Sequence, residues 1–164
     1  MNQNKPTQME KVFQAINSVN HNTYIEDIMI TDEIHFSSNR WDFRNYNLDG
    51  NIITDKPYQR LYNFSDLQSK QFKYLLKIII LKDKFVKNNT FSTTWSHYYL
   101  IKKFLLYLED KQTIYNLEFI SSKVLNNYLE LYKDKSIDYK MRTAHFLNFG
   151  NYIPVYTKHK IWYL

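Results

Sequence analysis

The hydrophobic pattern of this chain changes at Ser65, and that change limits the possible folds more than any other feature. From Ser65 to Phe149 apolar residues recur at intervals of three and four, the spacing of amphipathic helices. Short polar stretches at Asn88–Asn89, Glu109–Lys111 and Asp134–Ser136 can end one helix before the next begins. The pattern therefore predicts a mainly α-helical fold, a compact bundle of about four helices.

The first helix is predicted over Asp66–Lys87, with Ser65 as its N-cap. At about 100° per residue its apolar residues cluster on one side, and five lysines fall on the opposite side. These lysines are Lys70, Lys73, Lys77, Lys84 and Lys87. The helix is therefore expected to have one buried face and one lysine face toward solvent.

The second and third helices have clear starts and core faces. Ser92 or Thr93 is predicted to cap the second helix, and Ser121 or Ser122 the third, which extends to about Lys133. The core face of the second helix is predicted to hold His97, Ile101, Phe104, Leu105 and Leu108. That of the third is predicted to hold Val124, Leu125, Tyr128 and Leu131. For the histidine, a core position and a DNA contact both remain open.

The fourth helix is predicted over Ile137–Phe149, with Gly150 as the residue that ends it. Residues 151–164 include Pro154 and have no clear period, which predicts a tail or linker. The helical domain is therefore expected to span residues 65–150.

Residues 1–64 predict an N-terminal arm or small subdomain with short strands. Tyr24–Ile30 and Glu33–Phe36 are rich in β-branched and aromatic residues, and a turn at Asp49–Asn51 precedes Ile52–Thr54. Nearer the start, Thr7–Asn17 fits either a short helix or a disordered arm.

Three residues of this arm have specific expected roles. Trp41 and Phe43 are expected to anchor it against the helical domain, and Pro57 is expected to break any helix there. The arm is therefore expected to be attached to the bundle at the two aromatic residues, whether it forms strands or an extended segment.

Composition excludes several classes of function. The chain has two glycines and neither glycine-rich phosphate-binding motif, which argues against kinases, nucleotide hydrolases and dinucleotide-binding enzymes. It has no cysteine, and its five histidines are scattered, so neither a metal site nor a cofactor is expected. The adjacent carboxylates Asp32-Glu33 and Glu109-Asp110 are interpreted as solvated, and no catalytic residue is assigned.

The sequence also predicts a cytoplasmic protein. No run of about 18 apolar residues occurs, so a membrane span is not expected. The start, Met1–Glu10, is polar and contains no apolar signal region.

The positive charge lies entirely in the C-terminal part. Residues 1–64 hold 6 Lys+Arg and 8 Asp+Glu, a net charge of −2, whereas residues 65–164 hold 16 and 8, a net charge of +8. A cationic helical part is typical of a protein that faces a polyanion, although a solvated lysine-rich surface gives the same balance.

The segment Ser92–Leu108 resembles the core-binding domain of tyrosine recombinases and phage integrases. Thr93 at the helix start, Ile101, and Phe104–Leu108 match that family's pattern, whereas His97 stands where the family usually has tyrosine. Three other segments add to the resemblance, which covers about residues 39–153. They are Ile114–Ser121 before the third helix, Ser136–Leu147 at the fourth, and Arg40–Arg44, which is similar to a Trp-Asp-Leu-Arg segment of transposon-encoded recombinases.

The resemblance implies a SAM-like helical module that forms one half of a clamp on double-stranded DNA, with other recombinase protomers as possible partners. In the family the catalytic Arg, Lys, His and Tyr belong to a separate domain, and their motifs are not found in this sequence. The chain is therefore expected to be non-catalytic by itself, a truncated reading frame, a remnant or an excised piece, with residues 151–164 leading toward an absent catalytic domain.

The resemblance also implies which residues contact DNA. The five lysines of the first helix, together with the N-terminal ends of helices, are expected to bind phosphates. The residues expected nearest the bases are Ser92, Thr93 and Ser96, followed by Tyr139, Lys140, Arg142 and Thr143. For Ser92 and Thr93, a capping role alone remains open.

Two other functions remain open. One is a stand-alone helical DNA-binding regulator that occupies sites and blocks integration. The other is a protein-interaction bundle that docks a partner on its aromatic residues. Those residues would be Trp95, Tyr98, Tyr99, Trp162 and Tyr163.

Overall fold

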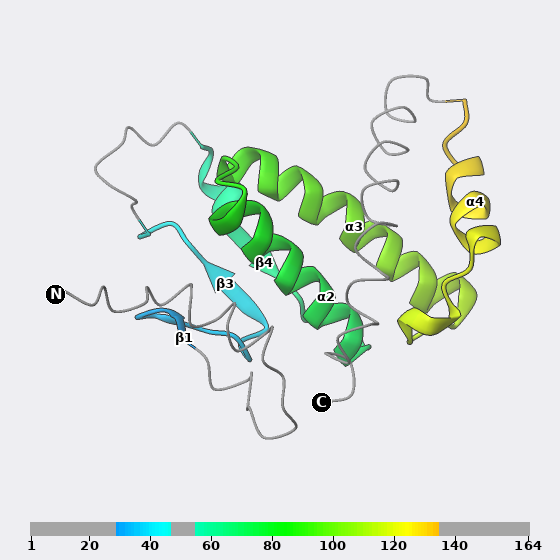
Figure 1. Cartoon of the computed structure of the whole chain (residues 1–164), viewed down its shortest axis with the longest axis horizontal. Coiled ribbons are helices and arrows are strands. Elements are labelled where there is room, and N and C mark those ends of the chain that lie inside the picture. The colour runs from blue at the N-terminus through cyan, green and yellow to red at the C-terminus, as the bar shows by residue number, and fades with distance from the viewer. Residues whose placement is uncertain (1–28, 47–54, 135–164) are drawn as a thin grey trace, which may run out of the picture.

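The computed structural model describes residues 29–46 and 55–134, and the fold is mainly helical with short antiparallel strand pairs (Figure 1). The helical elements are η2 (Pro57–Arg60), α2 (Lys70–Leu81), η3 (Lys82–Val86), α3 (Phe91–Gln112), η4 (Leu117–Phe119) and α4 (Ser122–Glu130). Here η3 is a π-helical continuation of α2, and η2 and η4 are 3₁₀ turns. The predictions for Thr7–Asn17, Ile52–Thr54, the fourth helix at Ile137–Phe149 and the tail at 151–164 lie outside the described residues.

Two antiparallel strand pairs precede α2 in the chain. β1 (Met29–Thr31) pairs with β2 (Ile34–His35), at the positions where strands are predicted. β3 (Arg40–Asp42) pairs with β4 (Leu61–Asn63), although the sequence pattern predicts neither strand. A three-residue strand has too little alternation to be recognised, and this hairpin forms because Trp41 and Tyr62, directly opposite each other, both enter the core.

Figure 1 shows the β3–β4 hairpin beside the antiparallel pair α2 and α3, with α4 at the far end. Trp41 and Phe43 are fully buried, so the prediction that they anchor the arm is confirmed. The Trp41 ring lies edge-on to Phe64, with 5.1 Å between ring centroids, and Tyr62 lies edge-on to Tyr98 of α3 at 5.0 Å. One hydrophobic core thus joins residues on both sides of the boundary predicted after position 64.

Several predicted helix starts are shifted. Ser69, not Ser65, caps α2, because its hydroxyl accepts the Phe72 N–H at 3.2 Å. Thr90, rather than Ser92 or Thr93, caps α3. Each true cap lies where the tertiary structure turns the backbone, and a serine or threonine one turn away has the same sequence signature.

The start of α4 is confirmed, but part of its predicted core face is wrong. Ser121 caps the helix and accepts the Val124 N–H at 3.3 Å. Tyr128 is buried, whereas Leu131 is 61% exposed because α4 ends at Glu130. The prediction that Pro57 breaks any helix is also wrong, because Pro57 begins η2. The backbone nitrogen at the first position of a helix donates no hydrogen bond within that helix, so proline is tolerated there.

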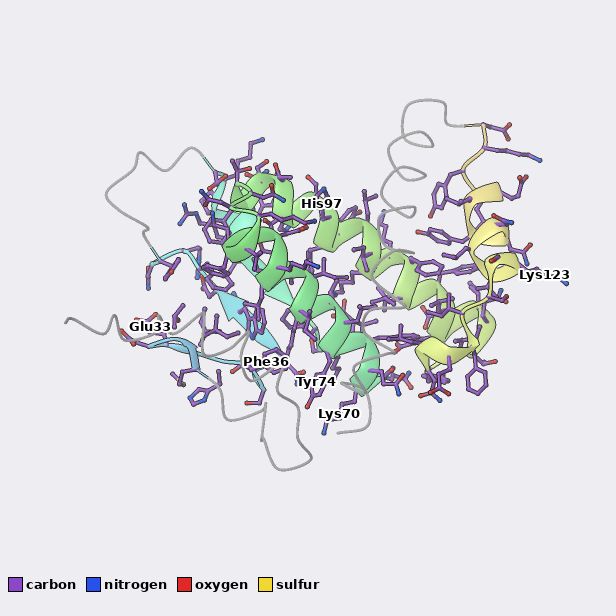
Figure 2. All side chains as sticks on the ribbon, in the orientation of Figure 1. Glu33, Phe36, Lys70, Tyr74, His97 and Lys123 are labelled. Carbon is purple, nitrogen blue, oxygen red and sulfur yellow. The ribbon has the colours of Figure 1, made fainter. Side chains whose placement is uncertain are left out.

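The lysine face predicted for the first helix does not form, because Lys77 is buried. The β3–β4 hairpin and the loop before it cover this side of α2, and Lys77 is only 2% exposed. Its ammonium lies 5.1 Å from the ring centroids of Phe36 and Phe64 and 5.5 Å from that of Trp41, and it donates to the Phe36 carbonyl. Figure 2 shows Phe36 close to Tyr74, which lies on α2 as Lys77 does. The centroids of the Phe36 and Tyr74 rings are 5.4 Å apart.

We expect Lys77→Met to destabilise the fold by about 1–3 kcal/mol, because the Phe36 carbonyl loses its charged donor inside the core. The matched control is Lys73→Met on the same helix, partly exposed, where a change within about 0.5 kcal/mol is expected. Urea unfolding of both variants measures the difference. Equal stability of the two variants would contradict the role given to Lys77.

Candidate nucleic-acid interface

The five lysines expected to bind phosphates occupy different environments. Lys70 is exposed and Lys73 partly exposed, but Lys77 and Lys84 are buried, so the predicted phosphate contacts are wrong for these two. Lys84 donates to the Asn89 carbonyl at 2.9 Å, and burial lowers its pKa. The exposed Lys87 pairs with a carboxylate of its own helix, at 2.9 Å. Periodicity places all five on one side of a helix but does not reveal what packs there.

The N-terminal ends of the two long helices are occupied by carboxylates of the protein itself. At α3, Asp55 accepts the Ser92 N–H at 3.2 Å. At α2, Glu109 accepts the N–H groups of Gln68 and Ser69 at 2.7 to 3.1 Å. Glu109 is 3% exposed, so its interpretation as a solvated residue is wrong. The positions that a phosphate would take at these ends are therefore already filled by negative charge.

The outer face of α3 carries a continuous set of hydroxyl, aromatic and cationic side chains. Ser92, Ser96, Tyr99 and Lys103 follow spacings of four, three and four residues, which align along one side of a helix. Ser96, Tyr99 and Lys103 are exposed, and Ser92 is partly exposed. No Asp or Glu occurs between Phe91 and Leu108. We call these four residues the α3 outer face.

Aromatic side chains border this face. Trp95 stacks on Tyr99, with ring centroids 5.1 Å apart and planes within 9° of parallel. The Lys103 ammonium lies 4.4 Å from the centroid of the same Tyr99 ring. Tyr58 of η2 lies edge-on to Trp95 at 5.1 Å. Spacing alone predicts the stack along the helix but not the contribution of η2, which is distant in sequence.

Two neighbours on α3 are engaged in contacts within the protein and do not belong to the α3 outer face. Tyr98 is 5% exposed, so its place in the predicted aromatic docking surface is wrong. Its hydroxyl and the Lys102 ammonium both donate to the Asn63 carbonyl at 2.7 Å, which joins α3 to β4. Lys102 also pairs with Asp66 at 2.7 Å.

Beyond its first turn, α3 contributes a histidine to an ionic cluster around the buried carboxylate of Asp83. His97 Nδ1 lies 2.6 Å from a carboxylate oxygen of Asp83 in η3, and Lys87 donates to the other oxygen at 2.9 Å. Burial raises the pKa of Asp83, but the hydrogen bonds from His97 and Lys87 outweigh it and hold that pKa below its ordinary value. The predicted core face of α3 is otherwise correct, since its four apolar members are buried.

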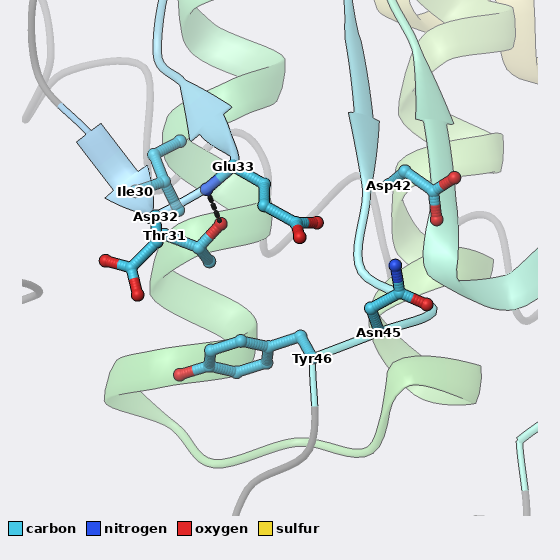
Figure 3. Close-up of a pocket in the computed structure, with 7 residues that line it drawn as sticks. All are labelled: Ile30, Thr31, Asp32, Glu33, Asp42, Asn45 and Tyr46. Carbon is cyan, nitrogen blue, oxygen red and sulfur yellow. Dashed lines mark hydrogen bonds between the residues drawn. The ribbon is translucent and has the colours of Figure 1, made fainter.

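A second surface has the opposite character. It is a hollow of about 360 Å³ whose lining includes Asp32, Glu33 and Asp42. Figure 3 shows these carboxylates around it, together with Asn45 and Tyr46. Hydrogen bonds from Arg44 hold the pKa of Asp42 below its usual range. Carboxylates make this side unsuitable for a polyanion. Among the residues that the structure describes, no group of three or more His, Cys, Asp or Glu side chains is arranged to hold a metal ion.

The four predicted contacts of the last helix, Tyr139, Lys140, Arg142 and Thr143, lie outside the described residues, as do Trp162 and Tyr163.

Comparison of the chain with protein-family models, with curated proteins and with solved structures found no match in any of the three. Within residues 29–46 and 55–134, no helix has the length and apolar character required to cross a membrane.

The Asp83 cluster predicts how stability depends on pH. Because the folded pKa of Asp83 lies below its ordinary value of 3.8, the ionised group stabilises the fold above that pH. This stabilisation is lost as the pH falls through 3.8 and then through the lower folded pKa. We expect the unfolding free energy of Asp83→Asn to fall less steeply than that of the wild type over this range, measured by urea unfolding. Parallel curves would show that Asp83 is not stabilised by its two donors.

Proposed function

We propose that this chain binds double-stranded DNA through the α3 outer face, as the DNA-binding part of a site-specific tyrosine recombinase, and that it is non-catalytic by itself. The observation that carries the proposal is that the residues of α3 itself include no carboxylate over the three or so turns of this face, where hydroxyl groups and Lys103 are exposed together. Such side chains bind phosphate oxygens and base edges. The same segment carries the resemblance to the recombinase core-binding domain.

The dimensions of the face suit a DNA groove. Ser92 and Lys103 are eleven residues apart, which corresponds to about 16 Å along a helix. A major groove is about 12 Å wide and admits an α-helix. The small side chains of Ser92 and Ser96 permit close approach of the helix to base edges, while Lys103 is placed to contact a backbone phosphate.

The structure changes how the DNA would be held compared with the sequence-based expectation. The central helix α2 is covered, and Lys77 and Lys84 neutralise no phosphate because both are buried. Asp55 and Glu109 occupy the helix ends. The proposed interface therefore depends on side chains along one helix and not on a lysine stripe or on helix dipoles.

A protein-docking function is the second candidate, and one observation favours it. Tyr58 is 47% exposed and Tyr99 is 39% exposed, and together with Trp95 they form a mixed aromatic surface next to the α3 outer face. Aromatic side chains are enriched at protein interfaces. The Lys103 ammonium lies against Tyr99, so this aromatic surface also contains a cation. A cation at this position suits a DNA phosphate as well as a protein partner.

Binding to a fluorescently labelled 20-base-pair duplex, measured by anisotropy at several salt concentrations, tests the proposal. We expect Lys103→Gln to weaken binding and to lower the slope of log affinity against log salt by about 0.9, one phosphate contact. The matched control is Lys111→Gln, an exposed lysine about two turns further along the same helix and about 80° from Lys103 around its axis, for which the slope of the wild type is expected.

Two results would contradict the proposal. Absence of salt-dependent duplex binding by the wild type would favour the protein-docking function. An equal loss in the Lys103 and Lys111 variants would show that binding follows total charge and not the α3 outer face.

A further inference from the structure

A second hollow lies where the β3–β4 hairpin meets α3. Its volume is about 550 Å³, within the range of small-molecule sites. It is lined by Asn39, Arg40, Leu61, Tyr62, Asn63, Ser65 and Tyr98. The acidic hollow of Figure 3 shares none of these residues. We call this second site the hairpin hollow.

Arg40 is the charged residue of the hairpin hollow. It is exposed on β3, directly opposite Asn63 of β4. Within the described part of the chain, Arg40 makes no ion pair, whereas the nearby Arg44 is held by Asp42 at 2.6 Å. The guanidinium of Arg40 therefore has its fork of N–H donors available to a ligand.

The two asparagines add donors rather than acceptors. The side-chain oxygen of Asn63 already accepts the N–H and the hydroxyl of Ser65, at 3.0 and 2.7 Å. The side-chain oxygen of Asn39 accepts the Lys73 ammonium at 3.4 Å. Each amide thus has its acceptor engaged within the protein, and the NH₂ groups remain as donors. Together with the Arg40 guanidinium, these NH₂ donors favour an anionic ligand.

The carboxylates near the hairpin hollow are neutralised. Lys102 pairs with Asp66 at 2.7 Å, and the Arg44 guanidinium donates to both oxygens of Asp42. With these two charges compensated, Arg40 and the adjacent Lys73 leave a local excess of positive charge. Planar guanidinium groups recognise phosphate through paired hydrogen bonds.

We infer that the hairpin hollow binds a phosphate group through Arg40, assisted by the amides of Asn39 and Asn63. The phosphate comes either from a free nucleotide or from the backbone of a bound nucleic acid. In the second case the inference rests on the proposed function, and the hollow supplies a further contact beside the α3 outer face, since Tyr98 of α3 forms its wall.

The test follows the side-chain amide resonances of Asn39 and Asn63 by NMR while inorganic phosphate, AMP or the 20-base-pair duplex is added. We expect these resonances to shift in the wild type, and Arg40→Gln to raise the dissociation constant at least about tenfold, the loss of one charged hydrogen-bonded contact. The charge-matched control is Lys123→Gln on α4, which Figure 2 places far from the hairpin and which is expected to bind as the wild type does.

The outcomes separate the two phosphate sources. Shifts with AMP that Arg40→Gln abolishes support a nucleotide site, even if Lys103→Gln shows that duplex binding does not occur as proposed. Shifts with the duplex alone, abolished by Arg40→Gln, support a backbone contact. No shift with any of the three probes, or equal shifts in the wild type and Arg40→Gln, would overturn the inference.

Discussion

The burial of one ammonium group among three aromatic rings is the interaction on which the rest of the structure depends. Lys77 lies near the middle of α2, and the rings around it come from the loop before β3, from β3 itself and from the residue after β4. A buried charge is costly unless it is compensated, and here cation–π contacts and the Phe36 carbonyl compensate it. The N-terminal hairpin is therefore part of the helical core and covers a helix that has no solvent-facing side over most of its length.

The same principle applies to other charges of this chain. Arg60 pairs with Asp55 in a nearly buried contact, Glu109 receives the N-terminal backbone of α2, and Asp83 joins η3 to α3. These groups hold elements together that are distant in sequence. Net charge consequently overstates the positive surface of the helical part, because several lysines and carboxylates compensate backbone dipoles or each other inside the protein.

What remains for binding is a small number of exposed donors on two adjoining elements. The α3 outer face presents hydroxyls and one lysine, and the hairpin hollow presents one arginine and two amides. Both are free of uncompensated carboxylates, whereas the hollow beside β1 and β2 is lined by three acidic residues. This separation of charge is the arrangement that the proposed binding of DNA requires. Tyr98 and Lys102, which join α3 to β4, keep the two donor surfaces in a fixed relation.

The sequence alone determined the local features: the approximate positions of α2, α3 and α4, a cap of α4 at Ser121 or Ser122, and the anchoring role of Trp41 and Phe43. These follow from spacing, capping chemistry and side-chain size, which act within a few residues. The tertiary structure decided which lysines reach solvent, which helix ends accept a ligand, and that Arg40 faces a hollow. A periodic pattern identifies opposite sides of a helix, but the environment of each side depends on what packs there. For Lys77 and Glu109 the partners are about 40 residues away in the chain, and no local pattern encodes that distance.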